Sequence, residues 1–292
     1  MSTLTLFINS LTTIDCAYFD KQRGLVGESW IVDVQMSGAQ DEQGMLMDFA
    51  DVKRVIKAYI DEAVDHRLLI PIQSEAVDIE QAGRRVNLTL SSGGVIEYQA
   101  PLQATAFIES KVITTDSVIQ HLKRGLSTLL TSNITDYQIS LRAEQIAGAY
   151  YHYSHGLKMH EGNCQRIVHG HRSKIVVHQN GARDTQLEET IAQLLADIYI
   201  VTEEDIQSTY FYQGQSYYHV AYTALQGDFS LKLPVALCYV MQDQSTVENI
   251  ALVLANQFAT QTDDKTITIT AYEGVSKGAI ALSPVMSKEA IL

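Results

Sequence analysis

The sequence contains few cysteines, few prolines and a shortage of positive charge, and each shortage excludes a class of protein. Three cysteines and four prolines among 292 residues exclude a disulfide-stapled scaffold and a proline-rich, low-complexity chain. Lysine and arginine number 21 against 34 acidic residues, and this net charge of −13 argues against a nucleic-acid-binding surface. The apolar runs are too short to span a bilayer, and residues 1–16 lack the features of a signal peptide. We therefore expect a globular cytoplasmic protein with no membrane or nucleic-acid partner.

Strand and helix patterns alternate along the chain and predict an α+β fold. Apolar residues at helical spacing predict helices over residues 48–65 and 115–130, with Asp48 as the N-cap of the first and one of residues 114–116 capping the second. The second half repeats this order, with helices predicted over residues 187–199 and 245–258. Strands are predicted over residues 4–14, 29–37, 86–90, 95–98, 138–143, 149–154, 173–178, 217–223, 229–233 and 266–272.

The repeated order of elements predicts an internal duplication. Three pairs of corresponding landmarks lie at offsets of 132, 131 and 129 residues: Asp65/Asp197, Thr115/Thr246 and Glu144/Glu273. Near-constant offsets are typical of two copies of one unit. We expect units over residues 1–147 and 148–292, joined strand to strand because no Pro/Gly-rich linker lies between them.

Histidine is distributed unevenly, since six of the nine histidines fall in one window of 27 residues. His169 and His171 are two residues apart, so on a strand their side chains project from the same face. His155 ends the preceding predicted strand, and antiparallel pairing would bring it opposite them. Three neutral imidazoles with an open fourth position describe a catalytic zinc site. The other histidines of this window are expected to have structural roles: His152, His160 and His178.

A cysteine and an Asp-His pair are the next candidates for chemistry. Cys164 lies in the loop between the predicted ligands, where a thiol beside a divalent cation can act as a thiolate base or nucleophile. Cys16 and Cys238 lie in apolar strand patterns, and we expect them to be inert. Asp65 and His66 follow a predicted helix, and a carboxylate can orient and charge an imidazole for acid–base work. A solvated helix end is the alternative interpretation of this pair.

Taken together, these motifs resemble the 6-pyruvoyl-tetrahydropterin synthase family, which includes the 6-carboxy-tetrahydropterin synthases of queuosine biosynthesis. The first half carries a Gly-x-x-x-Asp-Phe segment at residues 44–49 and Asp-His-x-x-Leu at residues 65–69. The second half has a Thr-x-Glu-Asn helix start at Thr246 and the family's His…Cys…His-Gly-His pattern at His155, Cys164, His169 and His171. The resemblance covers two family units, outside hairpin insertions near residues 75–110 and 205–233.

The resemblance implies a fold and an assembly. Each half would be a tunnelling-fold unit, an antiparallel sheet with helices on one face. Such units leave sheet edges open, and the family closes them into barrels by oligomerising. We therefore expect a homo-oligomer, with a trimer of tandem chains favoured.

The resemblance also implies an activity, that of a zinc-dependent lyase acting on 7,8-dihydroneopterin triphosphate. The product would be 6-carboxy- or 6-pyruvoyl-tetrahydropterin, with the former favoured by its frequency in bacteria. Cys164 would be the base and Asp65-His66 its partner relay, which the family takes from a neighbouring subunit. The resemblance implies that the zinc ligands are His155, His169 and His171. It also implies that Glu273 or Glu144, together with Thr246, holds the pterin. Arg166 or Arg172 would supply positive charge for the triphosphate.

The implied parts are divided between the two halves. The first half has Tyr18, Val26 and Glu28 at the zinc positions, and the second half has Asp197-Ile198 in place of the Asp-His pair. One half alone cannot supply the zinc ligands, the thiol and the Asp-His pair, here called the dyad. We therefore predict a composite site between the units. The alternatives are a pterin- or purine-binding protein without synthase activity and a metal-free ring-processing enzyme of the urate oxidase type. The histidine cluster argues against the latter.

Overall fold

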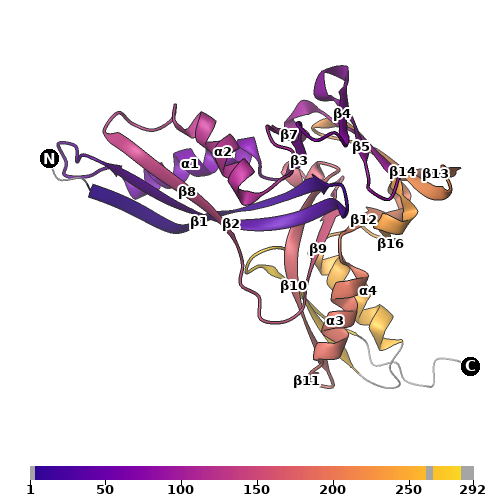
Figure 1. Cartoon of the computed structure of the whole chain (residues 1–292). Coiled ribbons are helices and arrows are strands. Elements are labelled where there is room, and N and C mark those ends of the chain that lie inside the picture. Colours follow the sequence, from indigo (N-terminus) through magenta and orange to yellow (C-terminus); the bar gives the residue numbers. More distant parts are fainter. Residues whose placement is uncertain (1–3, 261–265, 284–292) are drawn as a thin grey trace, which may run out of the picture.

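The computed structural model describes residues 4–260 and 266–283, which form three β-sheets and four α-helices (Figure 1). No helix in this part of the chain has the length and apolar character needed to cross a bilayer. The helices are α1 (Phe49–Ala63), α2 (Thr115–Leu126), α3 (Thr185–Leu194) and α4 (Val247–Ala259).

The N-terminal half forms a five-stranded sheet in the order β7-β3-β1-β2-β8. Its strands are β1 (Leu4–Asp20), β2 (Gly24–Gly38), β3 (Leu68–Pro71), β7 (Thr105–Ile108) and β8 (Ile134–Ala143). Helices α1 and α2 lie along one side of this sheet, and their apolar residues, such as Ile56 and Leu122, share a core with Val32 and Val34 of β2 (Figure 1). This burial of one helix face against one sheet face is the main source of stability of such a layer.

The C-terminal half forms a second sheet in the order β16-β12-β9-β10-β17-β18. Its strands are β9 (Tyr150–His155), β10 (His169–Gln179), β12 (Ile198–Thr202), β16 (Cys238–Met241), β17 (Ile267–Tyr272) and β18 (Gly278–Leu282), with the short β11 (Ala182–Arg183) beside β10. Helices α3 and α4 pack on it through residues such as Ile191 and Leu254. This sheet therefore repeats the layer arrangement of the first.

The two sheets have matching topologies. The order β7-β3-β1-β2-β8 corresponds strand for strand to β16-β12-β9-β10-β17, and the corresponding pairs run in the same relative directions. The predicted α+β class with helices on one face is confirmed. The sheets are mixed: the central hairpins are antiparallel, and β3 and β7, like β12 and β16, pair in parallel.

A third sheet is built from the two predicted insertions together. It has the order β13-β14-β15-β6-β5-β4, with β4 (Val77–Glu80), β5 (Arg85–Thr89), β6 (Val95–Gln99), β13 (Ile206–Tyr212), β14 (Gln215–Ala224) and β15 (Gly227–Pro234). Strands β6 and β15 join the halves, with Leu231 opposite Tyr98. Its buried residues, such as Leu88 and Leu231, share one core with Ile70 of β3 and Val201 of β12, so this sheet packs on both halves. Each predicted hairpin is thus part of a three-stranded piece of one shared sheet.

The β1–β2 and β9–β10 hairpins cross where two glycines meet. An ideal Cβ at Gly27 would lie 1.8 Å from the carbonyl oxygen of Tyr153, and one at Gly170 would lie 2.6 Å from the Cα of Gly27. No side chain fits at either position. The two hairpins are thereby held in backbone contact, which brings residues of β1 and β2 close to the histidines of β10.

Some predicted element ends are wrong. The N-cap Asp48 is confirmed, since its side chain accepts a hydrogen bond from the Ala50 N–H. The helix predicted over residues 187–199 ends instead at Leu194. Asp197 has a left-handed φ of 59°, and its N–H donates to the carbonyl of His152, so the chain turns directly into β12. The helix predicted over residues 115–130 likewise ends at Leu126.

Candidate active site

Strands β9 and β10 bring together the three histidines predicted as metal ligands. His155 is the last residue of β9 and lies directly opposite His169, the first residue of β10, so the predicted antiparallel pairing is confirmed. His171 follows two residues later on the same strand. The ring centroids are 4.5 Å apart for His155 and His169, and 5.4 and 5.7 Å from these to His171. All three side chains are fully buried.

Each of two rings is oriented by oxygen atoms at its Nδ1. The Nδ1 of His155 lies 2.9 Å from the backbone oxygen and 3.0 Å from the Oγ of Ser245, the residue before the N-cap of α4. The Nδ1 of His169 lies 3.3 Å from the carbonyl oxygen of Arg166. A carbonyl at Nδ1 places the proton there and leaves Nε2 free as a ligand.

The third ring, that of His171, faces a carboxylate from the other half of the chain. Its Nδ1 lies 3.2 Å from Oδ1 of Asp15 on β1. The same carboxylate accepts a hydrogen bond from the Ser29 hydroxyl and an ion-pair contact from Lys277 at 3.1 Å. Burial opposes ionisation of Asp15, but the neighbouring imidazole, ammonium and hydroxyl groups outweigh it and hold the pKa of this carboxyl below its usual range. A carboxylate behind a histidine is a common support of metal ligands.

The Nε2 atoms of the three histidines have no hydrogen-bond partner among the described residues. One ligand atom from each lies within 4.8 Å of the others. Buried polar atoms are normally satisfied, so three imidazoles that lie this close together with free Nε2 atoms fit a bound cation. Burial also lowers the pKa of His155 and of His169 well below the usual value, which keeps both rings in the neutral form that binds a metal. This cluster could therefore hold a metal ion.

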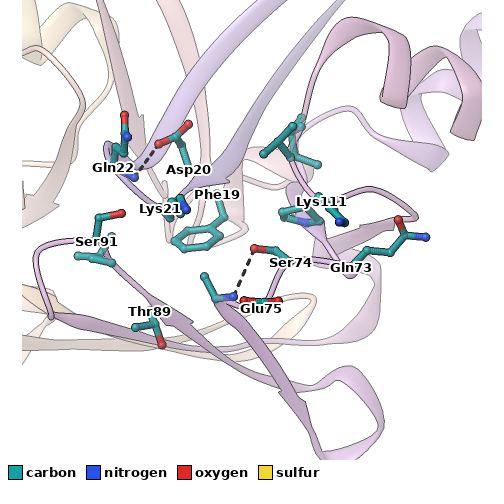
Figure 2. Close-up of a pocket in the computed structure, with 15 residues that line it drawn as sticks. Phe19, Asp20, Lys21, Gln22, Gln73, Ser74, Glu75, Thr89, Ser91 and Lys111 are labelled. Carbon is teal, nitrogen blue, oxygen red and sulfur yellow. Dashed lines mark hydrogen bonds between the residues drawn. The ribbon is translucent and has the colours of Figure 1, made fainter.

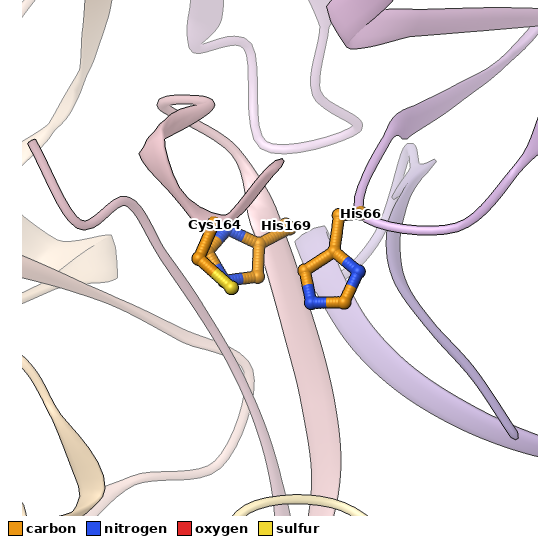
Figure 3. Close-up of side chains that lie close together, drawn as sticks. All are labelled: His66, Cys164 and His169. Atoms are coloured by element: carbon orange, nitrogen blue, oxygen red, sulfur yellow. The ribbon is translucent and has the colours of Figure 1, made fainter. Parts of the chain in front are cut away.

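Cys164 and His66 lie directly beside His169 of this cluster (Figure 3). Cys164 is held in a single 3₁₀ turn, Asn163–Gln165, between β9 and β10. Its Sγ lies within 4.8 Å of ring nitrogens of both His66 and His169. The dyad and the thiol, predicted to belong to one site, come from opposite halves of the same chain.

The dyad is ordered by hydrogen bonds. Oδ2 of Asp65 lies 2.6 Å from Nδ1 of His66. Burial by itself would lower the pKa of His66, but hydrogen bonds with Asp65 and Cys164 raise it to about 10. His66 is therefore a positively charged donor toward the thiol at neutral pH. Its backbone has a left-handed φ of 52°, and its N–H donates to the carbonyl of Asp15.

The residues predicted to hold the pterin lie at different distances from the cluster. Oε1 of Glu273 is 3.9 Å from Nε2 of His171, and its Oε2 is 3.7 Å from Lys277. Thr246 caps α4, where its hydroxyl accepts a hydrogen bond from the Asn249 N–H. The backbone oxygen of Glu144, in contrast, accepts from Arg172. The structure thus places Glu273 at the cluster.

In the N-terminal half, Tyr18 and Val26 lie opposite each other as His155 and His169 do in the C-terminal half. The structure also shifts one predicted equivalence. Asp197 corresponds to His66 and not to Asp65, because both residues have a left-handed φ and donate their N–H to the preceding hairpin. Asp197 meets no thiol; its carboxylate accepts two hydrogen bonds from Arg23, at 2.8 and 2.5 Å.

A cavity of about 660 Å³ lies elsewhere in the N-terminal half (Figure 2). It is lined from the end of β1, the loop after β3, the end of β5 and the segment before α2, with Asp20, Lys21, Glu75 and Lys111 among its residues. None of the predicted site residues, all of which the structure describes, lines this cavity. The charged side chains that line this cavity are of both signs and largely exposed, so they do not indicate which ligand it would bind.

Sequence reasoning missed several residues that shape the cluster. Asp15, Ser245 and Lys277 contact the ligands or each other, and Gln226 contacts the Cys164 loop. Asp15 carried a weak signal, as a charged residue inside an apolar strand pattern. Ser245 begins the helix predicted over residues 245–258, Gln226 lies between two predicted strands, and Lys277 follows the last one. No motif marks them as site residues.

The fold and the cluster define an α+β protein with a candidate metal centre where two similar halves meet. Residues 10–131 match the family model described as 6-pyruvoyl tetrahydropterin synthase. This part of the chain is similar to that family, in line with the resemblance seen in the sequence, and it contains Asp65 and His66. A comparison with curated proteins finds no significant match.

Solved structures with some likeness to this chain are synthases of the same name from two Plasmodium species. They include the 6-pyruvoyl tetrahydropterin synthase of Plasmodium falciparum, at 19% identity and a TM-score of 0.39. A catalytic-residue mutant of the Plasmodium vivax enzyme matches at 20% identity and a TM-score of 0.37. Each match covers 49% of this chain and 99% of the other.

Proposed function

We propose that this chain is a zinc-dependent pterin synthase, a lyase that converts 7,8-dihydroneopterin triphosphate to 6-carboxy- or 6-pyruvoyl-tetrahydropterin. The observation that carries the proposal is the set of three buried histidines, each with an Nε2 atom that lacks a hydrogen-bond partner, beside Cys164 and His66. Three neutral histidines favour zinc with an open coordination position. The family match over residues 10–131 supports the reaction class. Three free cysteines suit a cytoplasmic location.

The chemistry follows from the positions of the side chains. Zinc, when bound, polarises a side-chain oxygen of the substrate and makes the neighbouring C–H group more acidic. Cys164 lies beside the cluster, where its thiolate can take that proton. His66, charged and held by Asp65, stabilises the thiolate and can return a proton. Glu273 is near enough to hold the pterin ring over the cluster, with Thr246 at the adjacent start of α4.

We propose that the halves are tandem tunnelling-fold units over residues 1–147 and 148–292, and that copies of the chain assemble into a barrel. Matching strand orders support the duplication. Strands β8 and β18 form outer edges of the first two sheets, and Ile280 and Leu282 of β18 are 73% and 62% exposed. Open edges with apolar side chains favour pairing with another copy. Light scattering that shows a trimer would support this assembly, and a monomer would contradict it.

The function is tested on the purified full-length protein. We expect about one zinc ion per chain by elemental mass spectrometry, and conversion of the dihydroneopterin triphosphate to a tetrahydropterin product. His171→Ala should lose both zinc and turnover, whereas the exposed His160→Ala should keep both. Zinc-free protein, or full turnover by His171→Ala, rejects the proposal. Tight pterin binding without turnover would instead favour a pterin-binding protein.

A further inference from the structure

The turn between β14 and β15 reaches the loop that carries Cys164. Gln226 lies in this turn, and its side-chain Nε2 donates to Oδ1 of Asn163 at 2.8 Å. Its side-chain Oε1 accepts from Nε of Arg166 at 3.0 Å. Its backbone N–H donates to Oε1 of Gln165 at 2.6 Å. Gln226 therefore contacts the residues on both sides of Cys164.

Arg166 extends this contact to the dyad. Its Nη1 donates to the backbone oxygens of Asp65 and His66, both at 3.2 Å. Its own carbonyl oxygen faces Nδ1 of His169. Arg166 is only 4% exposed, so its guanidinium depends on these acceptors and on the amide oxygen of Gln226. One arginine thus links the thiol loop, the dyad and a predicted metal ligand.

Other contacts fix the turn and the loop at the same place. The hydroxyl of Tyr222 on β14 donates to the backbone oxygen of Gln165. The side chain of Gln103, from the N-terminal half, donates to the backbone oxygen of Gln226. The turn is therefore supported from both halves, through the shared third sheet. A support of this kind can hold a reacting group to a fraction of an ångström.

We propose that Gln226 is a positioning residue, which holds the Cys164 thiol against His66 through its hydrogen bonds to Asn163 and Arg166. The inserted β14–β15 hairpin is then part of the active site, although it lies outside the sheets that carry the catalytic groups. This inference rests on the proposed function for its effect on turnover. Its effect on the thiol does not depend on the substrate.

The test compares Gln226→Met, which removes both side-chain hydrogen bonds at similar size, with the wild-type full-length protein. We expect kcat to fall about tenfold with KM little changed, because misplacement of the thiol affects the chemical step. We also expect iodoacetamide to alkylate Cys164 several times more slowly in Gln226→Met than in wild type. Mass spectrometry of the peptide that contains Cys164 measures this rate. Gln226→Glu keeps the acceptor for Arg166. This variant should therefore recover most of kcat and most of the alkylation rate.

The matched control is Gln213→Met, at the tip of the neighbouring β13–β14 turn, where the side chain contacts Tyr212. It should behave as wild type. If wild type fails to turn over the pterin, the alkylation rates alone decide: slower alkylation in Gln226→Met but not in Gln213→Met still supports the positioning role. Equal alkylation in all variants overturns it, whatever the turnover. Should Gln226→Met fail to fold, Asn163→Ala gives the same comparison with one hydrogen bond removed.

Discussion

The two halves of the chain place different side chains at corresponding positions. In the C-terminal half, His171 faces the carboxylate of Asp15 from the other half, at 3.2 Å. In the N-terminal half, the acid and the base are exchanged, and Glu28 lies 3.9 Å from His152. The backbone at both places is alike, so the fold does not depend on which side chains occupy them. The C-terminal position has the three imidazoles of the candidate metal centre, whereas Tyr18, Val26 and Glu28 occupy the N-terminal one.

The same comparison extends to the dyad position. His66 approaches a thiol, whereas its counterpart Asp197 forms an ion pair with Arg23, which also donates to the Tyr18 hydroxyl. The loop between β1 and β2 is short, and Arg23 lies in it where the longer loop between β9 and β10 carries Cys164. One position thus places an imidazole beside a thiol, and the other forms an ion pair between the halves.

The largest effect is expected at the thiol. Cys164→Ala should lower turnover roughly a thousandfold, because it removes the proposed base. Zinc content should remain near one per chain, since the three histidines are untouched. The half-buried Cys238, on β16, provides the control, and Cys238→Ala should keep turnover. Substantial turnover by Cys164→Ala would show that the C-terminal position does not work as proposed.

The next effect concerns Glu28, at the counterpart position. Burial raises the pKa of Glu28 to about 7, above the usual value of 4.5. The folded state then holds a proton that the unfolded chain releases, so stability falls as pH rises from about 4.5 to about 7. Glu28→Gln should abolish this loss, a gain of up to about 3 kcal/mol at pH 8. Denaturant unfolding at pH 5 and pH 8 measures it, with the exposed Glu42→Gln as control; the same pH slope in wild type and Glu28→Gln would contradict it.

A smaller effect is expected at the carboxylate behind His171. Asp15→Asn should weaken zinc affinity about 10- to 100-fold, because the ring loses the group that orients it. Competition with a chromogenic chelator measures the affinity. Asp33→Asn, at the exposed ion pair with Arg142 on the same sheet, serves as control. Unchanged affinity in Asp15→Asn would remove the N-terminal half from support of the metal centre.

The smallest effect is expected at the ion pair of the counterpart position. Arg23→Ala and Asp197→Ala should each lower the free energy of unfolding by about 1 kcal/mol, since both groups are partly exposed. Turnover should be unchanged. The double variant should cost little more than either single one, and a double-mutant cycle measures this coupling. Loss of turnover in either variant would mean that the counterpart position also takes part in the reaction.

The sequence was sufficient for the features that depend on local pattern. The N-cap at Asp48 and the three histidines could be predicted because spacing along one helix or strand determines them. Short buried strands such as Leu68–Pro71 were missed, because four apolar residues show no periodicity. The helix predicted to run to residue 199 failed because the left-handed turn at Asp197 depends on a hydrogen bond to His152.

The composite nature of the site could be predicted, but its supports could not. That Asp65-His66 and the histidines belong together followed from the division of motifs between the halves. Asp15 and His171, or Gln226 and Asn163, meet only because two hairpins cross and two insertions share a sheet. Such contacts join residues far apart in the chain and leave no local trace in the sequence.

The pairing of β6 with β15 has a consequence for synthesis on the ribosome. The partner of Tyr98 on β15, Leu231, is made about 130 residues later. At roughly 5–20 residues per second, β6 waits on the order of ten seconds or more with one edge open. Unpaired edges invite aggregation during this interval. The yield of folded protein should therefore depend on translation speed and on chaperone supply, and not on the stability of the folded state alone.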